Sequence, residues 1–221
     1  MGFDSAGIPF ILNCHRNGVS FRQTITIGRQ GMHLHPSEFD RFREWFTLEE
    51  TLAAGGMCEA FLKKLGAVQV DSLDASDYEG ATCVRDLNIP IETEPQWSCV
   101  IDGGSLEHIF NFPQALKTCM EIVQEGGHFI GISPLNNQAG HGFYQFSPEI
   151  FYRAFSEANG FEVRLMENSS GHAIPDPAGK MESANGFGGY LYVLARRNKI
   201  VPLFQRWPQQ SSFTKMWNQS S

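Results

Sequence analysis

Residues 97–133 read WSCVIDGGSLEHIFNFPQALKTCMEIVQEGGHFIGIS, and this stretch decides the fold. It begins with an apolar run that ends in an aspartate and two glycines, which is typical of a buried strand followed by a turn. FPQALKTCMEIVQ then predicts a helix, with Pro113 in its first turn and Gly126–Gly127 at its end. HFIGIS predicts a second strand. A strand, a helix and another strand in this order indicate a crossover between parallel strands.

The same alternation continues on both sides of this unit. Strands are expected at residues 22–28, 68–74 and 81–84, helical segments at 36–65 (broken at Gly55–Gly56), and a helix at 147–160 with Ser147 as its N-cap. The last two strands, FEVRLMEN and GYLYVLARR, flank a loop at 168–189, so they are expected to form an antiparallel hairpin or to be joined by that loop. The expected fold class is α/β: a mostly parallel, doubly wound sheet in three layers with a reversed terminal strand.

Length, net charge and cysteine content limit the number of domains, the kinds of partner and the location that we expect. The 221 residues suit one domain over residues 1–200, followed by a C-terminal tail at 201–221. A net charge of −7 argues against nucleic acid or an anionic membrane as the partner. The five cysteines are odd in number and form no CxxC pair, which favours a reducing, cytoplasmic location. We find neither a signal-peptide pattern nor an apolar run long enough to span a membrane.

The tail is unusually aromatic for a chain terminus. VPLFQRWPQQSSFTKMW contains Phe204, Trp207, Phe213 and Trp217. This is too much apolar surface to leave in water. We therefore expect the tail to pack across its own domain or onto a second copy of the chain, which would give a homodimer.

Several of the expected strands end in polar residues or glycine. In open α/β sheets, ligands bind beyond the carboxyl ends of the strands, near the point where the strand order reverses. A carboxylate at such an end can accept hydrogen bonds from ribose hydroxyls or amines, although aspartate also caps turns routinely. The strand-terminal residues are Gly28, Asp74, Asp86, Asp102 and Ser133.

The run from about Gly66 to Arg196 resembles a class I S-adenosylmethionine-dependent methyltransferase. The best matched parts are VDSLDASDYEGATCVRDLNIPI and the run from Val100 to Phe155, which are similar to a bacterial group of small methyltransferase-like proteins. The resemblance implies S-adenosylmethionine as the cofactor. It assigns the ribose to Asp74, the adenine amine to Asp86 and the methionine part to the segment Asp102-Gly103-Gly104.

The turn after the first strand departs from that family. It reads ITIGRQGMH, and only Gly28 and Gly31 stand where the family has a glycine-rich motif. Arg29 and Gln30 add bulk there, and Arg29 adds a positive charge that would oppose the sulfonium of the cofactor unless it points away. A catalytically inactive scaffold or binding partner that has lost the cofactor is therefore the alternative hypothesis.

Two segments carry the candidate chemistry. His108 follows the fourth strand of the resemblance, and imidazole titrates near neutral pH, so His108 is the first candidate for a catalytic base. The segment PLNNQAGHGFYQFSPE adds His141 and Tyr144, which are expected to line one cavity with Asp102, Glu107 and His108. The expected reaction moves a methyl group to an oxygen or nitrogen of a small molecule, such as a sugar or another biosynthetic intermediate. The alternative is that His108 packs in the first turn of a helix and the segment is an ordered connection.

Other kinds of site receive less support. HLH at 33–35 lies near Glu38, and Glu107 adjoins His108, but no spacing resembles a structural zinc motif, so no metal site is expected. The chain contains no GxSxG motif and no P-loop lysine motif, which weakens the hydrolase and phosphate-transfer interpretations.

Overall fold

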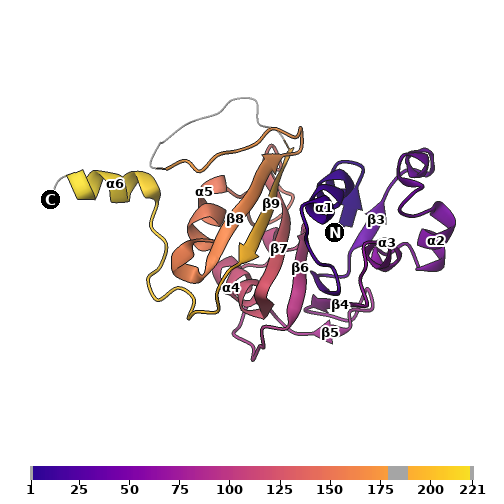
Figure 1. Ribbon diagram of the computed structural model, residues 1–221, viewed down its shortest axis with the longest axis horizontal. Coiled ribbons are helices and arrows are strands. Elements are labelled where there is room, and N and C mark those ends of the chain that lie inside the picture. Colours follow the sequence, from indigo (N-terminus) through magenta and orange to yellow (C-terminus); the bar gives the residue numbers. More distant parts are fainter. Residues whose placement is uncertain (1, 179–188, 220–221) are drawn as a thin grey trace.

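The computed structural model describes residues 2–178 and 189–219, which are built around a seven-stranded sheet (Figure 1). The strand order is β5-β4-β2-β6-β7-β9-β8, and β9 runs antiparallel to both of its neighbours while the other pairs are parallel. The strands are β2 (Gln23–Ile27), β4 (Gln69–Asp74), β5 (Cys83–Val84), β6 (Trp97–Gly103), β7 (Val123–Asn136), β8 (Phe161–Asn168) and β9 (Gly189–Arg197). The expected mostly parallel sheet with a reversed strand is confirmed. The chain builds the sheet outward in one direction from β2 and in the other from β6, so the switch point of the strand order lies between these two strands.

Helices cover both faces of the sheet, as Figure 1 shows. Successive residues of a strand point to opposite faces, so Val100 and Phe129 pack under one helical layer while Ile101 and Ile130 pack under the other. The first layer contains α4 (Phe112–Ile122) and α5 (Pro148–Ala154). The second contains α1 (Gly7–Arg16), the 3₁₀ helix η1 (Pro36–Phe42), α2 (Leu48–Ala53) and α3 (Glu59–Lys64). The helical segment expected at 36–65 is thus three short helices.

The N-terminal segment forms elements that the sequence did not predict. β1 (Gly2–Asp4) pairs in parallel with β3 (Gly31–His33), outside the main sheet. α1 follows directly, and its Phe10 ring stacks on Tyr192 of β9 with ring centroids 5.2 Å apart. This packing brings β1 to the edge of the sheet where the parallel strands end.

The end of α4 corrects the expected helix boundary. The helix was expected to end at Gly126–Gly127, but it stops at Ile122 and β7 begins at Val123. The cause is remote in sequence: the buried guanidinium of Arg197, on β9, donates hydrogen bonds to the carbonyls of Met120, Glu121 and Val123 at 2.6–3.1 Å. These carbonyls at the helix end therefore have a side-chain partner, and the chain turns into a strand.

The tail lies partly on its own domain. Phe204 packs against the core and stacks on Trp207 with ring centroids 5.5 Å apart, and the amide of Ser211 donates to Glu149 at 2.7 Å. α6 (Ser211–Gln219) extends from the body of the molecule in Figure 1, and its Trp217 is 54% exposed. The homodimer stays a prediction.

Other expectations concern loops and cysteines. The two short 3₁₀ helices η2 (Leu106–His108) and η3 (Glu157–Asn159) follow β6 and α5. Within the loop expected at 168–189, residues 179–188 lie outside the described part. All five cysteines are free thiols. Among the described residues, no helix is long and apolar enough to cross a membrane.

Candidate active site at the carboxyl ends of β6 and β7

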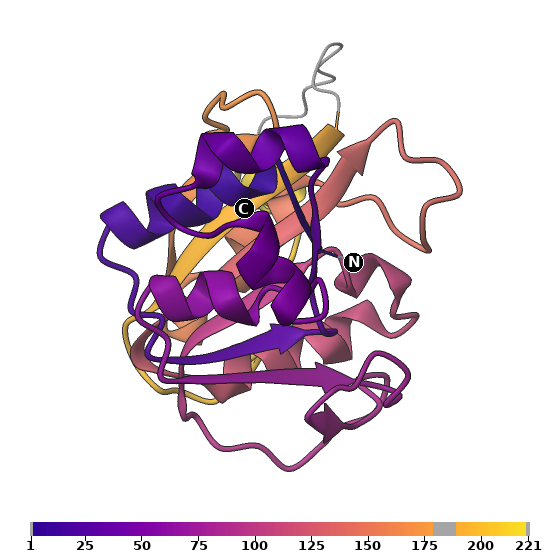
Figure 2. The ribbon, with the colours of Figure 1, turned by 90° about the vertical axis from the view of Figure 1, so that its right-hand side faces the viewer.

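A pocket of about 220 Å³ lies beyond the carboxyl ends of β6 and β7. Its walls come from β1, the end of β3, the turn after β6, and strands β7 and β9. The loop at 137–146, which Figure 2 shows extending past the end of β7, adds His141. The lining residues are Gly2, Asp4, His33, Gly103, Gly104, Glu107, His108, Ile132, His141, Tyr190 and Tyr192. The pocket is therefore where the rule for open α/β sheets locates ligands.

Asp102 shapes the turn that positions the site. One oxygen of this buried carboxyl accepts hydrogen bonds from the amides of Ser105 (2.8 Å) and Leu106 (3.3 Å), which starts the short helix η2 directly after β6. Asp102 is fully buried and does not line the pocket, so the expectation that it shares a cavity with Glu107 and His108 is wrong. Gly104, whose φ is +92°, makes the turn, and a Cβ there would lie 3.2 Å from Oε1 of Glu107. The aspartate–glycine–glycine sequence thus places Glu107 against the turn.

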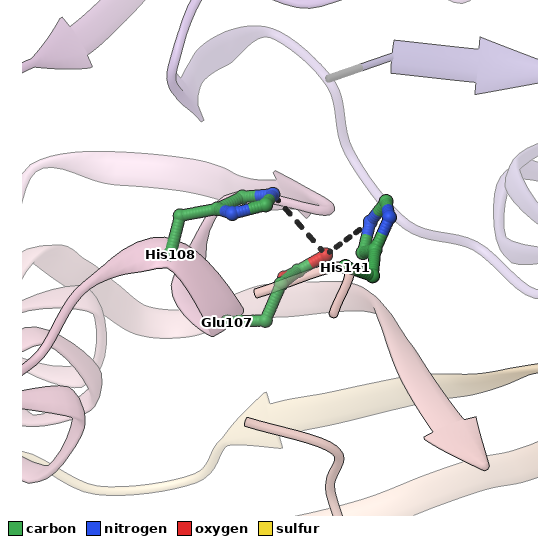
Figure 3. A group of neighbouring side chains, drawn as sticks. All are labelled: Glu107, His108 and His141. Atoms are coloured by element: carbon green, nitrogen blue, oxygen red, sulfur yellow. Dashed lines mark ion pairs between the residues drawn. The ribbon is translucent and has the colours of Figure 1, made fainter. Parts of the chain in front are cut away.

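Glu107 is the centre of the site. Its side chain is fully buried, and neither carboxylate oxygen has a hydrogen-bond partner among the described residues. Oε1 lies 3.5 Å from Nε2 of His141 and 4.0 Å from Nε2 of His108. Figure 3 shows the carboxylate between the two imidazoles, with His108 on η2 and His141 on the loop.

The loop that carries His141 is held on the backbone of Glu107. The amide of Phe143 donates to the carbonyl of Glu107 at 2.8 Å. Gly142 approaches so closely that a Cβ there would lie 2.8 Å from that same carbonyl oxygen. A glycine at this position lets the loop close over η2, which brings His141 to a residue 34 positions earlier in the chain.

Burial perturbs the titration of these groups. Burial raises the pKa of Glu107, and burial together with the nearby Glu107 charge raises the pKa of Asp102 well above its usual value. The pKa of His108 is lowered, first by burial and then by the neighbouring His141. A proton is therefore retained more readily on the carboxyls and less readily on His108 than in water.

Tyr144 does not join the pocket, so the expectation that it shares a cavity with His108 and His141 is wrong. Its hydroxyl donates to the carbonyl of Phe110 at 2.6 Å, and its ring stacks on Phe146. Tyr144 instead fixes the base of the loop. Asp4 and His33 do line the pocket, and neither was predicted. The sequence signal at Asp4 is one for a helix start: its carboxylate accepts hydrogen bonds from the amides of Ala6 and Gly7, where α1 begins.

The comparisons with known proteins concern the fold. No protein-family model matches the sequence, and no curated protein matches it. The candidate methyltransferase in a complex with the Haloferax volcanii Trm112 methyltransferase activator is 12% identical, with a TM-score of 0.53 over 86% of this chain and 89% of that chain. The chain has the class I methyltransferase fold. The MccD protein is also 12% identical, with a TM-score of 0.50 over 86% of this chain and 96% of that chain. Because identity is this low, the likeness establishes the fold and leaves the activity to the site residues.

The methyltransferase fold implies S-adenosylmethionine, and the strand-end carboxylates fit its adenosine half. Asp74 ends β4, and its carboxylate accepts one hydrogen bond, from the amide of Ser76 at 3.4 Å. Asp86 follows β5, the neighbouring strand, and is exposed; hydrogen bonds from Asn88 lower its pKa, so it is an ionised acceptor. The two carboxylates therefore stand at adjacent strand ends, each with capacity for a ligand.

The turn after β2 fits the methionine half less well. The amide of Gly28, whose φ is +70°, donates a hydrogen bond to the carbonyl of Leu73 on β4. Gly31 is the first residue of β3, where it pairs with Gly2. The Arg29 guanidinium pairs with Glu59 at 2.7 Å and with the carbonyl of Glu79, so its charge is neutralised away from the pocket. Gln30 is fully buried, and its amide fills the space beside Gly103, at the point where the strand order reverses. Gln30 and the Phe3 ring thus occupy the space beside Gly103 that a small strand-end residue would otherwise leave open.

Proposed function

We propose that this protein transfers a methyl group from S-adenosylmethionine to an oxygen or nitrogen of a small molecule. The observation that carries the proposal is the carboxylate–imidazole pocket beyond the carboxyl ends of β6 and β7 in a class I methyltransferase sheet, next to Gly103 and Gly104. Methyl transfer needs mainly the alignment of a nucleophile with the sulfonium methyl, and at times a base that takes a proton. The pocket supplies groups suited to both tasks.

Each residue has a role in the proposal. Asp74 would hold the ribose and Asp86 the adenine amine, while Asp102, Gly103 and Gly104 would border the methionine part and Gly28 and Gly31 shape the first turn. When bound, the cofactor supplies an electrophilic methyl group. His108 and His141 would bind the acceptor and receive its proton. Tyr144 would act as a positioning residue, because it fixes the loop of His141. A small acceptor such as a sugar suits a pocket of this volume, and five free thiols suit a reducing cytoplasm.

Calorimetric titration with S-adenosylmethionine and S-adenosylhomocysteine tests the proposal. We expect saturable binding to the wild-type protein. Asp74→Ala should weaken it by about 1–3 kcal/mol, the range for losing a charged hydrogen-bond partner. Asp71→Ala is a matched control, because Asp71 lies on the same strand but bonds to Gln69 instead of standing at the strand end. Absence of binding at millimolar cofactor would end the methyltransferase interpretation.

A second candidate function is a binding or assembly protein that retains the sheet without the cofactor. The buried Gln30 amide beside Gly103 favours it, since this side chain lies where a ligand would cross from the pocket to Asp74. The Haloferax volcanii neighbour was solved in a complex with an activator protein. By extension, we propose under this candidate that the present chain also binds a protein partner. Under this candidate, S-adenosylhomocysteine leaves the melting temperature unchanged at every concentration.

A further inference from the structure

We propose that Glu107, His108 and His141 bind one divalent transition-metal ion of the zinc type. The three side chains each offer one ligand atom, and these atoms all lie within 4.8 Å of one another. Two imidazoles and one glutamate are a ligand set that catalytic zinc uses, with the remaining position open to water or substrate. The spacing in the sequence hides this set, because His141 comes from a different loop.

The geometry of the cluster is close to what an ion requires. Ligands at about 2.0–2.1 Å from a tetrahedral ion lie roughly 3.3 Å from one another. The carboxylate oxygen of Glu107 is already 3.5 Å from Nε2 of His141 and 4.0 Å from Nε2 of His108. Both histidine side chains are about 40% exposed, 41% and 39%, so small rotations of the rings can close the remaining gaps. Glu107 is the fixed member and the histidines are the adjustable ones.

The burial of Glu107 is the independent observation that points to a cation. A fully buried carboxylate without hydrogen-bond partners is costly unless it is neutralised or coordinates a metal. Among the described residues, neither lysine nor arginine lines the pocket, whereas Asp4 adds a second carboxylate. Among the described residues, the groups that pair with this carboxylate are the imidazoles of His141 and His108, and a bound divalent ion would compensate its charge through the same atoms.

The inference stands apart from the proposed methyl transfer. With an ion bound, His108 holds the ion instead of a proton, and the acceptor's oxygen or nitrogen would occupy the open position of the ion. Without cofactor binding, the same ion would still be held. A metal titration without cofactor therefore tests the metal site alone. A cofactor titration of the metal-free protein tests the methyltransferase proposal alone, so either proposal can fail while the other stands.

Cobalt is the probe for the test. The full-length protein, without an affinity tag, is stripped with a chelator and titrated with Co²⁺, followed by calorimetry and by the visible d–d absorption of the ion. We expect one equivalent to bind and to be displaced by Zn²⁺. Glu107→Gln and His141→Ala should each weaken binding by about 100-fold or more, since even residues that only support a ligand are worth 10–100-fold.

The control is His128→Gln. His128 lies on β7, four residues before Ile132 of the pocket and toward the opposite end of the strand, so this variant removes a histidine without touching the cluster. We expect it to bind Co²⁺ as the wild type does. His141 lies on a loop, so His141→Ala keeps the test available if Glu107→Gln fails to fold. Unsaturable binding by the wild type, or equal affinity in the wild type and His141→Ala, would overturn the proposal.

Discussion

Replacing Gln30 with alanine tests whether one buried side chain controls access of the cofactor to the pocket. The amide Nε2 donates to the carbonyl of Ile27 at 2.5 Å and to Oγ of Ser105 at 3.2 Å. A methionine group that enters between β2 and β6 must displace this amide and break these two bonds, together with a longer one to the carbonyl of Gly28 at 3.4 Å. At about 0.5–1.5 kcal/mol net for each of the two shorter bonds, the displacement costs about 1–3 kcal/mol. Gln30→Ala removes that cost, so it should tighten cofactor binding by roughly 5- to 150-fold.

The effect on folding should be smaller. The variant loses the hydrogen bonds of Nε2, but it also removes the buried Oε1, which has no partner among the described residues. The two changes partly cancel, and we expect a net loss of about 1 kcal/mol, or about 2–4 °C in melting temperature for a chain of this size. Gln114→Ala is the matched control: its Nε2 bonds to Thr118 within α4, away from the crevice, and its affinity for cofactor should equal that of the wild type.

Calorimetric titration with S-adenosylhomocysteine measures the change. A folded Gln30→Ala protein that binds no more tightly than the wild type would refute the idea that Gln30 blocks the crevice. Absence of binding in both proteins would mean that the fold has lost the cofactor for a reason other than this side chain, and the binding-protein candidate would replace the enzyme.

Three further predictions follow from particular side chains. His108→Ala should lower turnover by roughly 10²–10⁴ while the melting temperature changes little, because His108 is partly exposed at the pocket; an unchanged rate per folded molecule would exclude a catalytic role. Burial and the neighbouring Arg196 and Arg164 lower the pKa of His128 to about 4, below its unfolded value near 6.5. The native state therefore favours neutral His128. The stability that this provides is lost as pH falls from about 6.5 toward 4. Thermal melts between pH 7.5 and 4.5 should therefore show a shallower decline for His128→Gln than for the wild type, and parallel curves would contradict this. Deleting residues 201–221 removes Phe204 from the core and should lower the melting temperature, and light scattering will show whether the mass also halves, as the predicted homodimer requires.

Local patterns were sufficient for most of the sheet. The runs FEVRLMEN and GYLYVLARR coincide with β8 and β9, and WSCVIDG coincides with β6, because a buried strand is a short apolar run that glycine or a polar residue ends. Ser147 caps α5 as predicted, because its hydroxyl needs only the amide of Glu149, two residues later. The position of Asp102 and Glu107 at a strand end also followed from the chain itself.

The errors have a common cause, which is contact between residues distant in sequence. α4 ends early because Arg197, more than 70 residues later, binds its last carbonyls. β1 was missed because a three-residue strand is defined only by its pairing with β3. Tyr144 was expected in the pocket because its loop lies there, but its hydroxyl donates a hydrogen bond to the carbonyl of Phe110 instead.

The sequence by itself determined the α/β class, the reversed strand and the edge of the sheet where a ligand would bind. These follow from periodicity and from strand ends, which are properties of neighbouring residues. Only the tertiary structure decided that His141 meets Glu107 and that Gln30 fills the crevice beside Gly103. Both contacts depend on how separate loops pack at the end of the sheet, and the spacing of residues along a chain does not encode a distance between two loops.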